Sequence, residues 1–103
     1  MADKQKVTAQ PMTTGRIHAR VIDEENGLQQ ISNVRAVRIK SKDYVLLIME
    51  DYTSTLGQVD GDVIFLCTDR EVSLENVRGF YKLQKNEFSL LIQEDKDGWY
   101  EKV

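Results

Sequence analysis

The 103-residue sequence has few of the residues on which membrane, disulfide and metal chemistry depend. Its apolar runs reach only five residues, as in Val45 to Met49, whereas a membrane-spanning helix needs about 20. The single cysteine, Cys67, excludes an intramolecular disulfide and a cysteine-rich zinc site. The first residues contain no apolar stretch of signal-peptide length. We therefore expect a cytoplasmic, reduced chain without direct membrane insertion.

Neither sign of charge dominates. The chain has 14 Lys and Arg residues and 17 Asp and Glu residues, which give a net charge of −3 with the signs interspersed. Nucleic-acid binding needs a basic stripe that neutralises phosphates, so we expect no nucleic-acid partner. The stretch from Arg35 to Lys42 is locally basic, and Arg38, Lys40 and Lys42 share one face if it is a strand. Such a stripe either binds an acidic partner or, more commonly, is a solvated strand face. Its charge is also typical of a protected sheet edge.

Catalytic constellations are also missing from the sequence. The one histidine, His18, lies on the polar side of an alternating stretch, which is typical of a surface residue. Neither a GxGxxG nor a GxxxxGK[ST] phosphate-binding loop is present. The segment from Asp60 to Asp62 lacks the ligand spacing of an EF-hand, and its Asp-Gly pair is explained by a turn. The sequence predicts that the protein is not an enzyme and has no catalytic, cofactor-binding or metal-binding residues and no cofactor.

Short alternating segments separated by turn residues predict an all-β fold. In residues 16–22, Ile17, Ala19 and Val21 face one way and polar residues face the other until Ile22. Further strands are expected at 28–31, 34–40, 44–49, 62–67, 71–74, 76–83 and 88–92, with turns at 26–27, 41–43, 57–61, 68–71 and 85–87. No window has helical periodicity. The prediction is a small antiparallel β-sandwich, or a barrel-like sandwich, over residues 16–95, with a flexible N-terminal segment 1–15 and a C-terminal tail 96–103.

The order of these segments resembles the N-terminal β-sandwich domain of the epsilon subunit of rotary ATP synthases. The resemblance is carried by 17–23, 34–41, Leu56, Gly61, 63–65, and the glycine-led strand 79–83 joined through Lys85-Asn86 to 88–92. Three features depart from the family, and the first is that its double glycine is here a single one, Gly79. The segment 42–52 has none of the Gly, Pro and His of the family's docking loop, and the eight residues after Asp95 are too few for its C-terminal helical hairpin. The resemblance implies an epsilon-subunit-like fold and a non-catalytic role in docking to the central stalk and the membrane rotor ring.

The segment from Tyr44 to Tyr52 is the part of the sequence that we associate with binding. Tyr44, Ile48, Met49 and Tyr52 are of types enriched in interface cores, although a buried strand and its turn would have the same composition. Because Val45 to Met49 would make a poor sheet edge, we expect this run to be central in a sheet or covered by a subunit.

Two functional hypotheses follow from the sequence. The first is a non-catalytic protein-interaction module that binds a protein partner in a complex or associates with itself, and a membrane-associated complex is compatible with it. The alternative is a genuine, truncated epsilon-type stalk subunit. The sequence leaves the partner, the binding face and the oligomeric state open.

Overall fold

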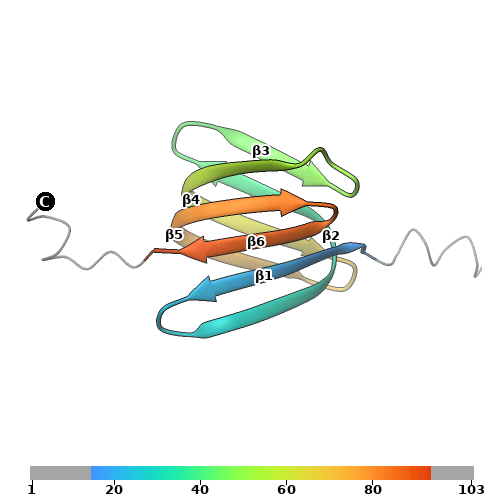
Figure 1. Ribbon diagram of the computed structural model, residues 1–103, viewed down its shortest axis with the longest axis horizontal. Helices are drawn as coiled ribbons and strands as arrows, with labels where there is room; N and C mark the ends of the chain where they lie inside the picture. Colours follow the sequence, from blue (N-terminus) through green and yellow to red (C-terminus); the bar gives the residue numbers. More distant parts are fainter. Residues whose placement is uncertain (1–14, 94–103) are drawn as a thin grey trace, which may run out of the picture.

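The computed structural model describes residues 15–93, which form six β-strands and no helix (Figure 1). The strands are β1 (Ile17–Asp23), β2 (Gly27–Ser41), β3 (Val45–Met49), β4 (Thr55–Cys67), β5 (Glu71–Gln84) and β6 (Glu87–Ile92). The predicted all-β fold is confirmed. A helix capable of crossing a membrane is absent from the described residues. The predicted N-terminal segment, except Gly15, and the predicted C-terminal tail lie outside the described residues.

Five of the six strands close into a barrel (Figure 1). The sheet has the order β1-β6-β5-β4-β2-β3, and an additional pairing of β1 with β2 closes the ring. Strand β3 pairs with β2 alone and is the extra, sixth strand. All neighbours are antiparallel except β1 and β6, which are parallel. The fold is thus a small closed barrel with one appended strand, and the sequence had left sandwich and barrel open.

The long strands β2, β4 and β5 make this closure possible, because their backbone or their pairing is irregular where the sequence pattern is interrupted. Asn33 in β2 and Asn76 in β5 have φ angles of 59° and 56°. The pairing of β4 with β5 shifts in register between Gly61 and Val63. Such bulges bend and twist a strand without ending it, so a single strand passes from one wall of the barrel to the other. The predicted turn at 57–61 is therefore wrong, and the separate strands expected at 28–31 and 34–40, and at 71–74 and 76–83, are continuous.

The hairpin turns at both ends of the barrel follow the sequence prediction. Gly27, after the turn residues 24–26, has a φ of 72°. Lys85 and Asn86 both have positive φ, 49° and 61°, as a type I′ turn requires. The carbonyl of Asn86 accepts a hydrogen bond of 2.9 Å from the N–H of His18, which ties the β5–β6 turn to the start of β1.

The core fills the barrel with side chains from alternate strand positions, as period-two patterning requires. Phe88 lies at its centre, with its ring edge-to-face to Phe65 at a centroid distance of 5.8 Å and stacked on Tyr81 at 5.9 Å. The buried cluster consists of Ile17, Ala19, Val21, Ile31, Val34, Val37, Ile39, Ile48, Val59, Val63, Phe65, Val77, Tyr81, Leu83, Phe88 and Leu90. The inward residues expected in the first and last strands, Ala19 and Leu90 among them, are confirmed.

Strand β3 lies at the edge of the sheet, so of the two alternatives for Val45 to Met49 the central position is wrong, and cover by a subunit stays a prediction. The basic stretch from Arg35 to Lys42, expected to suit an edge, is the central one: β2 pairs there with β3 on one side and β4 on the other. The charges of this stretch are compatible with a central position, because Val37 and Ile39 point into the barrel while Arg38 and Lys40 reach solvent from the outer face.

Candidate protein-binding surfaces

The outer face of β3 is apolar and exposed. Val45, Leu47 and Met49, which we call the edge surface, have 70%, 44% and 52% of their area exposed. They alternate with Leu46 and Ile48, which point toward the core. No charged residue lies within β3. Natural edge strands are usually protected by charge, proline or a bulge, so this unprotected strand is suited to contact with another surface.

The backbone of β3 also has unused hydrogen-bonding capacity. The N–H of Ser41 donates to the carbonyl of Tyr44 at 2.9 Å, and the N–H of Tyr44 donates to the carbonyl of Ser41 at 3.4 Å. Since hydrogen-bonded and non-hydrogen-bonded pairs alternate in an antiparallel ladder, the N–H and C=O groups of Val45, Leu47 and Met49 point away from β2. No strand within residues 15–93 pairs with this side of β3.

The edge surface continues across β2. Leu47 lies opposite Arg38, which lies opposite Ile64 of β4. Arg38 is exposed, and within the described residues it has no ion-pair partner. A cation thus lies beside exposed apolar side chains, an arrangement that suits a partner with an acidic group surrounded by apolar residues.

The four residues predicted for binding do not share one environment. Met49 and Tyr52 are exposed, as binding requires. Ile48 is fully buried and packs in the core, so its prediction as a contact residue is wrong. The wrong expectation arose because every residue of β3 is apolar, so the sequence does not show which alternate positions point inward.

Tyr44 is half-buried and has a structural role. Its hydroxyl donates to the carbonyl of Gln58 and lies 3.1 Å from the hydroxyl of Tyr81. Burial, and then the hydrogen bond with Tyr44, raise the pKa of Tyr81 above its ordinary value. These contacts connect the start of β3 to β4 and β5, and they position the edge surface.

A polar cluster fixes the other end of β3. The guanidinium of Arg16 lies 2.6 Å from the carboxylate of Asp51, and its backbone N–H donates to Glu50 at 3.1 Å. The N–H of Asp51 donates to the side-chain oxygen of Asn86 at 2.7 Å, and the Asn86 amide donates back to Asp51 at 3.1 Å. The hydrogen bonds from Asn86 and Arg16 hold the pKa of Asp51 below its ordinary value.

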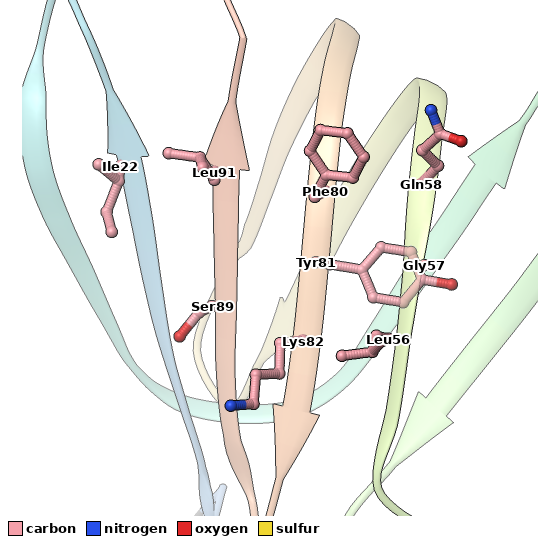
Figure 2. A pocket seen from close by; sticks show the side chains of 9 residues that line it. All are labelled: Ile22, Leu56, Gly57, Gln58, Phe80, Tyr81, Lys82, Ser89 and Leu91. Atoms are coloured by element: carbon pink, nitrogen blue, oxygen red, sulfur yellow. The ribbon is translucent and has the colours of Figure 1, made fainter.

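A second apolar surface, a groove across β1, β6, β5 and β4, was missed by the sequence analysis (Figure 2). It encloses about 480 Å³. Two levels of outward side chains line it in Figure 2, with Ile22, Leu91, Phe80 and Gln58 in one and Ser89, Lys82 and Leu56 in the other. Strand register explains both levels. Ile22, Leu91, Phe80 and Gln58 are successive cross-strand partners in the first level, and Ser89, Lys82 and Leu56 are successive partners in the second.

One sequence signal could have revealed the groove. Each of its strands carries an apolar residue on the face that is otherwise polar. Ile22 follows Arg20 on this face, and Phe80 lies between two basic residues at 78 and 82. A single such residue is unremarkable, but closure of the barrel brings three of them, Ile22, Leu91 and Phe80, into one row.

The residues considered for chemistry are dispersed. His18 lies 3.1 Å from the side chain of Gln30 and 3.7 Å from the carboxylate of Glu87, on the polar face as expected. Cys67 is half-buried, and burial raises the pKa of its thiol. Asp60 pairs with Lys42 at 3.4 Å and belongs to β4. Within the part of the chain that is described, no group of three or more His, Cys, Asp or Glu residues is placed to hold a metal ion.

Comparisons with known proteins extend the picture at the level of fold. No protein-family model and no curated protein matches the sequence. The barrel is similar to a chain in the cryo-EM structure of the central stalk and c-ring of the mitochondrial ATP synthase of Tetrahymena thermophila. The TM-score is 0.61 at 9% identity, and the match covers 79% of this chain and 66% of that chain. The resemblance to rotary ATP synthases is therefore present in the fold, and fold similarity alone does not assign a function.

Proposed function

We propose that this chain is a non-catalytic protein-interaction module of the cytoplasm, which binds a protein partner within a complex through the edge surface. The observation that carries the proposal is the unprotected strand β3, in which Val45, Leu47 and Met49 are exposed. An isolated apolar residue on a surface is ordinary, but three on one unpaired strand favour association. Arg38 beside Leu47 favours a partner that places an acidic group among apolar residues.

A second candidate is an epsilon-type stalk subunit of a rotary ATP synthase. The specific observation that favours it is the structural similarity to a chain of an ATP synthase central stalk and c-ring. The partner would then be a stalk or rotor-ring protein, and the complex would be membrane-associated. The two candidates share the same surface chemistry and differ in the identity of the partner.

The decisive experiment is purification of the tagged chain from its native cells with mass spectrometry of the bound proteins. Recovery of stalk and ring subunits of a rotary ATP synthase supports the second candidate. Recovery of a different, stoichiometric complex supports the first. Recovery of the tagged chain alone, as a monomer, contradicts both.

A pair of matched variants assigns the binding to the edge surface. Leu47→Lys places a charge in the edge surface, and Leu28→Lys places one at an exposed leucine of β2 outside it. If the partner covers Leu47, the first variant loses about 2 kcal/mol of binding free energy, roughly 30-fold in Kd, since an apolar contact is replaced by a charge. The second variant should bind as the native chain does. Equal affinity of the native chain and both variants would exclude the edge surface.

A further inference from the structure

The groove presents an apolar surface without a cover among residues 15–93. Ile22, Leu91, Phe80 and Leu56 are all exposed, the last of them to 71%. The row formed by the first three extends through Leu28, which lies opposite Ile22 on β2 and is also exposed. The continuous apolar row therefore crosses four neighbouring strands of the barrel.

Cations border this apolar row on one side. Arg20 and Lys82 both lie opposite Ser89, one on each neighbouring strand, in the level next to Leu91 and Phe80. Both side chains are exposed, and neither has an ion-pair partner within the described residues. Ser89, which Figure 2 shows below Leu91, is small and leaves room between these two cations. A ligand that combines a large apolar group with acidic groups is complementary to this surface.

The described part of the chain ends beside the groove. Gln93 follows Leu91 by two residues, and its N–H donates a 2.8 Å hydrogen bond to the carbonyl of Arg78 on β5. The next residues of the sequence are Glu94-Asp95-Lys96-Asp97-Gly98-Trp99-Tyr100. They combine three acidic residues with two adjacent aromatic ones, one of which, Trp99, is the single tryptophan of the chain.

We propose that the segment from Glu94 to Tyr100 binds the groove, with Trp99 packed on Phe80 and Leu91 and with the acidic residues near Arg20 and Lys82.

The segment is long enough for this contact. From Gln93, the far end of the groove at Leu56 lies two strands across and four residue levels along the sheet, roughly 16 Å. The six residues from Glu94 to Trp99 span up to about 20 Å when extended. A chain that reverses directly after Gln93 and then runs extended therefore brings the indole to Phe80 and Leu91 without displacement of β6.

The two apolar surfaces then have different roles. The groove is covered by this chain's own segment, whereas the edge surface is left for a partner. Because the groove lies on β1, β6, β5 and β4 and the edge surface on β3, one surface can be occupied independently of the other.

Fluorescence of Trp99 tests the proposal directly, because no other tryptophan contributes to the signal. In the native chain, we expect an emission maximum at shorter wavelength than that of tryptophan in water, and weaker quenching by acrylamide. Phe80→Ser should move the maximum to longer wavelength and increase quenching. Leu47→Ser is the matched control: it removes an apolar side chain of the same 44% exposure outside the groove, and it should leave the emission unchanged.

Three further measurements make the result unambiguous. Far-UV circular dichroism verifies that Phe80→Ser is folded, and Lys82→Glu provides a second variant at an exposed position that leaves the apolar contacts in place. Lys82→Glu should also shift the emission to longer wavelength, because it repels the acidic residues. Dilution of the native chain should leave the emission unchanged, since the contact is intramolecular.

The opposite results overturn the proposal. Emission typical of tryptophan in water in the native chain, unchanged in both groove variants, shows that the groove does not bind the segment. A short-wavelength emission that is lost on dilution assigns the groove to the segment of a second copy and refutes intramolecular binding. A shift caused equally by Leu47→Ser shows that Trp99 contacts a different surface.

Discussion

Replacement of Phe88 by alanine should remove a large part of the stability of the barrel. Phe88 is fully buried, and its ring contacts Phe65 edge-to-face and stacks on Tyr81. Truncation loses the transfer free energy of the ring, leaves a cavity in a closed core, and deletes both aromatic pairs. Buried Phe-to-Ala substitutions cost about 3–5 kcal/mol, a large fraction of the roughly 5–15 kcal/mol that stabilises a typical domain.

Phe80 is the matched control because it is the same residue type on the neighbouring strand, with 44% of its area exposed. Its removal loses about half of the transfer free energy of a phenylalanine, together with the proposed contact with Trp99, and leaves no closed cavity, so Phe80→Ala should cost about 1–2 kcal/mol. Urea unfolding followed by far-UV circular dichroism measures both values, with the slope m unchanged if the denatured state is the same. A cost for Phe88→Ala no larger than that for Phe80→Ala would refute the packing described for the core.

Three further predictions concern single residues. Hydrogen bonds from Asn86 and Arg16 lower the pKa of Asp51 in the folded state, so its carboxylate stabilises the fold above its ordinary pKa, and that contribution is lost as pH falls through the lowered folded value. Asp51→Asn should therefore flatten the acid limb of a urea-stability profile measured from neutral pH to about pH 3, and an unchanged slope would count against the cluster. Gly79→Ala should cost about 1–3 kcal/mol in thermal unfolding, because a Cβ would lie 2.1 Å from a carbonyl oxygen of β6, and a native melting temperature would contradict this close approach. The thiol of Cys67 should react with a disulfide reagent more slowly than a free thiol, because burial raises its pKa, and should reach the free rate in urea; an equal rate in the folded chain would refute its burial.

Alternation along the sequence was sufficient to predict the class of fold. Ile17, Ala19 and Val21 are inward as predicted, and the turn residues Asn26-Gly27 and Lys85-Asn86 form the hairpins expected of them. These features depend on neighbouring residues in the chain, and short-range patterns determine them.

The number of strands was not predictable in the same way. Asn33, Asn76 and Gly61 interrupt the pattern as turn residues do, but the chain continues as a strand through each of them, with bulges at Asn33 and Asn76. A bulge and a turn use the same residue types, and long-range pairing decides between them. The parallel contact of β1 with β6 is likewise a consequence of closure and has no local signal.

The candidate surfaces show the same division between local and long-range information. Met49 and Tyr52 are exposed, whereas Ile48, predicted with them, is buried. The groove was missed because Ile22 and Phe80 are 58 positions apart in the sequence and become neighbours only through Leu91. Composition alone located the apolar segment from Val45 to Met49. The pairing of the strands in the structure was needed to show which of its side chains are exposed.

The open edge of β3 follows from the geometry of closure. Strand β2 has 15 residues, whereas β1, which pairs with its first half on the side away from β4, has seven. The second half of that side is covered by β3, and β3 then has no further strand beside it because β1 is already joined to β6. The fold thus requires an edge at this position but does not require it to be apolar. With 31 charged residues in the chain, from 14 basic and 17 acidic ones, none lies in β3. Since charge at an edge prevents association, the uncharged edge is the feature on which we base the proposal that a partner covers Val45, Leu47 and Met49.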